Sequence, residues 1–242
     1  MLTKTEAIVL HSFKYGEQKL IVEMFTRQHG RLAFVVSLPK SPRAKLKKQY
    51  FQPLTLLQVA YDYRPQVQLQ KMSEAALLAP LSDLYTAPSK LAIALFLAEF
   101  LFHALKGEQQ NEPLFEYLLS AIQWLDGCEQ QFANFHLVFL MHLSRFLGFY
   151  PNLEQVPGDN YFDLRAGTFC AAPPLHRDFL MPQEASMMRL MMRMDLPTMH
   201  LFRMNREQRN RCLEVALHYY RLHLTDFPVL RSVDVLKELF NG

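Results

Sequence analysis

AIVLHSFKYGEQKLIVEMFTRQHGRLAFVV, residues 7–36, is the stretch that decides the fold class of this 242-residue chain. Within and just before it, β-branched and aromatic residues are concentrated in three short segments, which predicts three strands. Turn residues around Gly16 and Gly30 separate these segments. The predicted strands are residues 5–13, 19–26 and 31–37.

Two more segments of the same texture follow, at residues 54–61 and 67–73. Five short strands within 75 residues predict a small closed barrel. The OB-fold is the commonest five-stranded barrel of this size, and its open face and loops often bind oligonucleotides. An SH3-like barrel has nearly the same number of strands, so the choice of an OB-fold rests partly on charge.

The charge is divided unevenly along the chain. Residues 1–75 hold 12 Lys and Arg against 5 Asp and Glu, whereas residues 76–242 hold 14 against 18. Clustered positive charge attracts polyanions and displaces counterions from phosphate, so the first part is predicted to bind nucleic acid. A basic face that is merely solvated is the alternative interpretation.

Beyond residue 77 the sequence becomes helical, with apolar helices predicted at residues 89–106, 111–126 and 132–149. Further helices are predicted at residues 183–194, 205–223 and 233–240. Between them, residues 151–182 hold five prolines and predict an irregular insertion with a possible hairpin at 161–164 and 168–170. The chain is thus predicted to be α+β, with an OB-fold domain at 1–77 and a mainly helical domain at 78–242.

Residues 7–36 also resemble the opening of the RecO family of bacterial recombination mediators. In that family a strand leads through a Tyr-Gly-Glu turn to a segment that ends Phe-Thr-x-x-x-Gly, as it does here. The resemblance covers nearly the whole chain. Its further motifs are Gln52-Pro53-Leu54, Leu147-Gly148-Phe149-Tyr150-Pro151 and Arg231-Ser232-Val233-Asp234-Val235-Leu236.

The resemblance implies an OB-fold followed by a helical domain, in a protein that anneals DNA strands and helps to load recombinase. It implies as partners single- and double-stranded DNA, RecR and the acidic C-terminal tail of single-strand binding protein. Some members of the family carry a four-cysteine zinc module in the insertion. Here only Cys170 lies in that region, so no zinc is expected.

The candidate nucleic-acid-binding residues are cations in and around the predicted barrel. Five of them lie in one loop between the third and fourth strands, and two pairs flank the first two turns. Long cationic side chains in such places can follow a phosphate backbone. The candidates are Lys14, Lys19, Arg27, Arg31, Lys40, Arg43, Lys45, Lys47 and Lys48.

Aromatic residues of the barrel are candidates for stacking on unpaired bases, although aromatic residues in strands are more often core. The candidates are Tyr15, Phe34, Tyr50 and Tyr61, with Phe34 expected in the core. In the helical part, arginines at helical spacing are weak candidates for binding an acidic peptide tail. They are Arg189, Arg193, Arg203, Arg206 and Arg209, for which solvation or pairing with Glu207 and Glu214 is an equal alternative.

Several function classes are made improbable by the sequence. The chain has no His-Glu-x-x-His, no Gly-x-Ser-x-Gly, no phosphate loop and no Gly-x-Gly-x-x-Gly, so no enzyme and no cofactor is predicted. Its three cysteines are far apart and predict neither a disulfide framework nor a metal site. No signal peptide or membrane span is predicted, so a cytoplasmic, nucleoid-associated location is expected.

The function predicted from these observations is a DNA repair and recombination mediator that binds single- and double-stranded DNA, promotes strand annealing and helps recombinase loading on DNA coated by single-strand binding protein. The alternative is a non-catalytic adaptor or regulator whose barrel binds RNA or a peptide, since a barrel fold does not determine its ligand.

Overall fold

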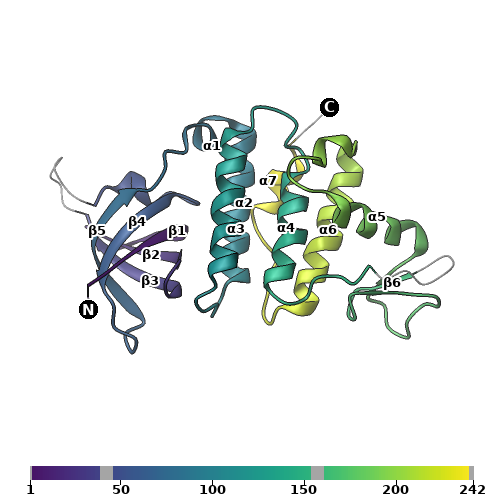
Figure 1. Ribbon diagram of the computed structural model, residues 1–242, viewed down its shortest axis with the longest axis horizontal. Coiled ribbons are helices and arrows are strands. Elements are labelled where there is room, and N and C mark those ends of the chain that lie inside the picture. The colour runs from purple at the N-terminus through teal and green to yellow at the C-terminus, as the bar shows by residue number, and fades with distance from the viewer. Residues whose placement is uncertain (1, 39–45, 154–160, 240–242) are drawn as a thin grey trace. The chain divides into compact units, whose positions relative to one another are not determined.

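A computed structural model describes residues 2–38, 46–153 and 161–239 of the chain (Figure 1). It divides into two compact units. The first comprises Met1–Gly127 and Leu230–Leu236, and the second comprises Cys128–Val229 and Lys237–Gly242. The barrel and the helices α2 and α3 therefore belong to the same unit.

Five strands form a closed barrel in the order β1-β2-β3-β5-β4. The barrel closes through antiparallel pairing of β1 with β4, and β3 with β5 is its parallel pair. This mixed order is that of an OB-fold, which confirms the predicted fold class. The strands are β1 (Leu2–Tyr15), β2 (Lys19–Thr26), β3 (Gly30–Ser37), β4 (Leu56–Asp62) and β5 (Leu69–Leu77).

Strand β1 changes the direction of its side chains along its length. Its register with β2 shifts between Val9 and His11, so the alternation that places Val9 in the barrel core is interrupted there. Beyond the shift, Phe13 is paired with Ile21 and Tyr15 with Lys19. Directly paired residues share a face of the sheet, so Phe13 and Tyr15 lie on the outer face of the barrel.

Three helices complete the folded part of the first unit after the barrel. They are α1 (Ser82–Thr86), α2 (Pro88–Ala104) and α3 (Glu112–Gly127). Helices α2 and α3 agree with the predicted helices at 89–106 and 111–126, whereas α1 was not predicted. Helix α2 is apolar on most faces, and ten of its residues are buried. Asn111 accepts a hydrogen bond from the backbone N–H of Leu114 at 3.1 Å and so caps α3.

The second unit contains α4 (Phe135–Phe146), α5 (Pro182–Arg193) and α6 (Arg206–His223). The short helix α7 (Val233–Lys237) belongs to the first unit except for its last residue. Helix α6 begins with a reciprocal capping box between Asn205 and Gln208. Tyr220 of α6 donates to the carbonyl of Leu140 in α4 at 2.7 Å, which fixes these two helices against each other.

The insertion forms a small sheet in the order β7-β6-β8. Its strands are β6 (Tyr161–Asp163), β7 (Thr168–Cys170) and β8 (Phe179–Leu180). The predicted hairpin is confirmed, whereas the two-residue β8 was not predicted because so short a segment has no periodicity. No helix in the described ranges is both long and apolar enough to cross a lipid bilayer.

Candidate nucleic-acid interface

The turns on either side of β2 lie at opposite ends of the barrel. Lys14 and Lys19 flank the β1–β2 turn at one end, and Arg27 and Arg31 flank the β2–β3 turn at the other. Strand β3 runs back and ends with Ser37 opposite Lys19, so the β3–β4 connection leaves from the first end. The two pairs of cations therefore do not form one continuous site.

Among the residues that the structure describes, four exposed lysines are gathered at the first end, which we call the lysine end. They are Lys14, Lys19, Lys47 and Lys48. Lys14 and Lys48 line the same groove, which has a volume of about 620 Å³. Its floor includes Ser12, whose hydroxyl donates to the carbonyl of Phe51 at 2.8 Å.

The 3₁₀ turn η1 (Lys48–Phe51) forms the other wall of this groove. Phe51 is buried in the barrel core, which anchors the turn, while Gln49 stays exposed. The ammonium of Lys47 lies 5.9 Å from the ring centroid of Tyr50. Lys40, Arg43 and Lys45 belong to the same connection but lie outside the described residues, so their role stays a prediction.

Arg27 is engaged within the protein. It binds the Glu6 carboxylate at 2.6 and 2.7 Å, also contacts Glu112 and Glu116 of α3, and lies 4.6 Å above the ring of Phe115. Burial alone would lower the pKa of Arg27, but the hydrogen bonds that its guanidinium donates to the three carboxylates raise it. This side chain fastens the barrel to α3.

Arg31 makes a similar junction with α2. It binds Glu23 at 3.1 Å, donates to the carbonyl of Phe102 and stacks 4.5 Å above the ring of that residue. Gly30 before it lies so close to the α2–α3 connection that an added Cβ would be 2.4 Å from the carbonyl carbon of Gln109. The interface proposed below therefore uses the lysine end and not this end.

The aromatic stacking candidates fall into two groups. Phe34 and Tyr61 are fully buried and meet edge to face at 4.9 Å, which confirms Phe34 as core and makes the stacking role of Tyr61 wrong. Burial raises the pKa of Tyr61 to about 12. Tyr15 is 55% exposed. Phe13 is 45% exposed, although the sequence analysis did not include it among the stacking candidates.

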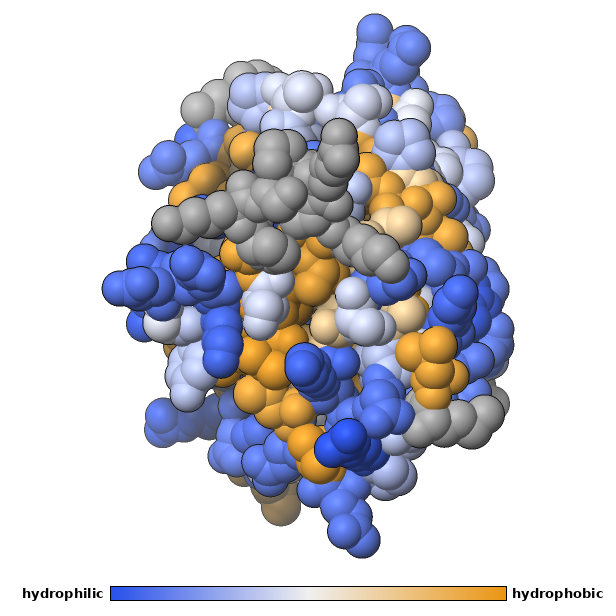
Figure 2. All heavy atoms as spheres, turned by 90° about the vertical axis from the view of Figure 1, so that its left-hand side faces the viewer, coloured by the Kyte–Doolittle hydropathy of each residue, from blue (hydrophilic) through white to orange (hydrophobic). Residues whose placement is uncertain are grey.

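Figure 2 shows a connected band of apolar residues on this face, bordered by hydrophilic residues. Such a surface differs from an ordinary solvated face, on which apolar residues are scattered singly. The signal for Phe13 was present in the sequence, since it stands two residues before Tyr15 in the same strand. The register shift of β1 concealed which of the alternating residues face outwards.

The arginines of the second unit do not form a single cluster. Arg209 is 8% exposed and donates to Asn134 at 3.2 Å and to the carbonyl of Met204 at 2.9 Å. Burial lowers its pKa. Arg206 donates to the carbonyl of Lys237 at 2.8 Å, and Arg189 lies 4.2 Å above the ring of Phe169.

Arg193 and Arg203 are exposed. Glu214 was one of the two carboxylates considered as partners of the arginine candidates. It binds Arg211 at 3.4 Å and Lys237 at 2.6 Å instead. Of the five arginine candidates, Arg209 is thus a structural residue of the helix packing, which donates hydrogen bonds to Asn134 and to the carbonyl of Met204. Sequence spacing predicted its helix face but not its burial.

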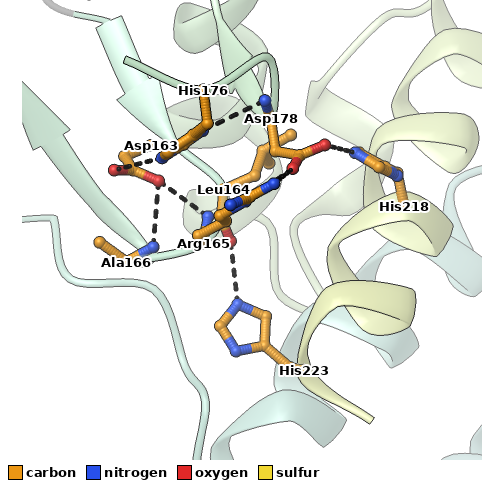
Figure 3. A network of polar contacts seen from close by, with 8 residues as sticks. All are labelled: Asp163, Leu164, Arg165, Ala166, His176, Asp178, His218 and His223. Carbon is orange, nitrogen blue, oxygen red and sulfur yellow. Dashed lines mark hydrogen bonds and ion pairs between the residues drawn. The ribbon is translucent and has the colours of Figure 1, made fainter. Parts of the chain in front are cut away.

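A polar network fastens the small sheet to α6 (Figure 3). Asp178 binds Arg165 at 2.6 Å and His218 of α6 at 3.0 Å, and the hydrogen bond from Arg165 lowers the pKa of Asp178. His223 of α6 donates to the carbonyl of Leu164 at 2.9 Å. Across the described ranges, no three His, Cys, Asp or Glu side chains are arranged to hold a metal ion.

These features define a class of protein: an OB-fold barrel with a cationic end, joined to helices by the half-buried Arg27 and Arg31, in a chain whose second part is helical. Comparison with known proteins agrees. Residues 1–81 match the family described as Recombination protein O N terminal, and residues 86–231 match Recombination protein O C terminal.

Related chains match over their full length. DNA repair protein RecO of Bacteroides fragilis is 52% identical over 242 residues, covering all of both chains. The proteins of the same description from Phocaeicola vulgatus and Porphyromonas gingivalis are 51% and 30% identical, again over the whole of both chains. The chain belongs to the RecO family of DNA repair proteins, which are non-catalytic recombination mediators.

Proposed function

We propose that this chain binds single- and double-stranded DNA at the lysine end of the barrel, anneals complementary strands and helps recombinase to load on DNA coated by single-strand binding protein. The observation that carries the proposal is the group of exposed lysines at this end, Lys14, Lys19, Lys47 and Lys48, of which Lys14 and Lys48 line one groove. Three more cations of the candidate site, Lys40, Arg43 and Lys45, lie in the same connection of the chain.

Annealing needs a surface that reduces the repulsion between two polyanions. Each lysine that contacts a phosphate releases a condensed counterion, which makes binding favourable and independent of base sequence. Such contacts hold the strand by its backbone and leave the base edges available for pairing with a second strand. A non-catalytic mediator of this kind works by position and charge alone.

The same proposal includes protein partners. RecR and the acidic C-terminal tail of single-strand binding protein are the partners that fit a RecO family mediator. The exposed Arg193 and Arg203 are the most accessible of the arginine candidates for an acidic tail, because their charges are not buried in helix packing. The proposed location is the bacterial cytoplasm, at the nucleoid.

The test is binding of a fluorescent single-stranded oligonucleotide over a salt series. In the variant with Lys14, Lys19, Lys47 and Lys48 changed to Ala, the log-log slope should flatten by about 0.7 for each lost contact, or about 3 if all four are lost. The control is Lys106→Ala, which removes an exposed lysine from the α2–α3 connection, beside the Arg31 end of the barrel.

The proposal predicts an unchanged slope for Lys106→Ala and a flattened slope for the fourfold variant. An unchanged slope in the fourfold variant would contradict the placement of the interface. A wild-type protein that binds RNA or a peptide in preference to DNA would favour an adaptor instead.

A further inference from the structure

The outer face of the barrel beside the lysine end carries an exposed aromatic pair. Phe13 and Tyr15 lie on the same side of β1, and their exposed fractions are 45% and 55%. The cross-strand partner of Phe13 is Ile21, which in turn is paired with Val35. These two aliphatic residues are half-buried, so they support the aromatic pair from the side.

Positive charge borders this apolar row on both sides. Lys19 stands opposite Tyr15 in the register, and Lys71 of β5 stands opposite Val35. Lys14 lies between the two aromatic residues in sequence, and it lines the groove of the lysine end together with Phe13. A ligand that presents flat apolar surfaces joined by anionic groups therefore complements the row.

Helix α2 covers the neighbouring part of the same strand and stops short of the pair. His11 packs against Phe102 of α2 with ring centroids 4.9 Å apart, and Phe13 is 5.8 Å from His11. The helix therefore contacts the strand as far as His11 and leaves the next two outward positions, Phe13 and Tyr15, exposed. Exposed aromatic rings of this size cost hydrophobic free energy unless a ligand covers them.

We propose that Phe13 and Tyr15 form a stacking platform for unpaired bases of single-stranded DNA, with the lysines binding the adjoining phosphates. The inference rests on the proposed function and adds to it a preference for unpaired strands. Stacking on aromatic side chains is tolerant of sequence, because every base has a flat π-face.

The spacing of the pair explains the preference. Residues two apart in a strand are separated by about 6.8 Å, which is twice the roughly 3.4 Å spacing of stacked nucleotides in one strand of a duplex. Two adjacent bases must separate from each other to reach both rings. A duplex does not offer its base faces, so it can use the lysines but not the platform.

The test compares a fluorescent oligothymidine with a duplex of the same length, at one salt concentration and over a salt series. Changing Phe13 and Tyr15 to Leu keeps the apolar volume and removes the rings. Affinity for the single strand should fall about tenfold for each ring that stacks on a base, while the duplex affinity and both salt slopes stay the same. Phe13→Tyr and Tyr15→Phe should retain wild-type affinity.

The matched control is Tyr63→Leu. Tyr63 stacks on His29 at 3.7 Å, at the opposite end of the barrel, and its replacement should not alter binding of either probe. Melting temperatures establish that all variants are folded. If the Leu variants keep both the wild-type salt dependence and the wild-type affinity for the single strand, the stacking platform is overturned but the proposed function is not. An equal loss of affinity for the duplex would overturn the platform in the same way. Absence of DNA binding by the wild type would overturn the proposed function itself.

Discussion

Replacing Arg27 by Met should destabilise the first unit by breaking the junction between barrel and helix. The guanidinium is 20% exposed and is shared among Glu6, Glu112 and Glu116. Loss of the two hydrogen bonds to Glu6 costs about 1.5–3 kcal/mol, because one partner is charged and largely buried. Loss of the stacking on Phe115 adds about 0.5–1 kcal/mol, whereas the half-exposed Glu112 and Glu116 contribute little.

The expected loss of unfolding free energy is therefore about 2–4 kcal/mol, which corresponds to a fall of roughly 4–16 °C in Tm for a chain of this length. Differential scanning calorimetry measures it directly. The control is Arg64→Met, because Arg64 pairs at 3.2 Å with Asp62 and both side chains are at least half exposed. That variant should melt like the wild type. Equal melting temperatures for the two variants would refute the structural role of Arg27.

Two further predictions concern other close contacts of the first unit. Gly30→Ala should cost about 2–4 kcal/mol by urea unfolding, because φ is +66° and the new Cβ would meet backbone at 2.4 Å. Gly16→Ala, with φ +71° and open space, should cost only about 1 kcal/mol, and similar losses for the two would contradict the close approach. Glu99 accepts hydrogen bonds from the N–H groups of Arg231 and Ser232 at 2.9 and 2.8 Å. Burial alone would raise the pKa of Glu99, but these bonds and the Ser232 hydroxyl lower it overall. Its stabilisation should therefore be present above the unfolded pKa of about 4.5 and be lost as the pH falls through the lower folded pKa. The gap in unfolding free energy between wild type and Glu99→Gln should close in acid, and a gap independent of pH would contradict this.

Local periodicity was enough to predict the five strands of the barrel and the helices α2 and α3, but not the five-residue helix α1. The five barrel strands and the helices α2 and α3 were expected within a few residues of their observed bounds, because each has a strong pattern of its own. It was harder to predict which cations share one end of the barrel, since this depends on the length of β2 and on the direction in which β3 returns. Lys14 and Arg27 consequently were grouped in one candidate site although the structure places them at opposite ends.

Burial of polar residues was the other feature that spacing could not predict. Arg203 and Arg209 were chosen for the same helical spacing. Arg209 is buried and donates hydrogen bonds to Asn134 and to the carbonyl of Met204, whereas Arg203 is exposed. Val9 and Phe13 are both apolar residues of β1 and lie an even number of positions apart. Val9 points into the barrel and Phe13 points outwards, because the register shifts between Val9 and His11. Such differences arise from tertiary packing, which a single sequence does not display.

The central claim is that DNA lies on the lysine end and on the adjoining outer face of β1. The most direct measurement is photo-crosslinking of the wild-type protein to a single-stranded oligonucleotide that carries 5-iodouracil, followed by mass-spectrometric identification of the modified peptides. The account predicts crosslinks at Phe13 and Tyr15 and in the peptide that contains Lys47 and Lys48. Crosslinks confined to residues 27–31, or to the helices of the second unit, would contradict it.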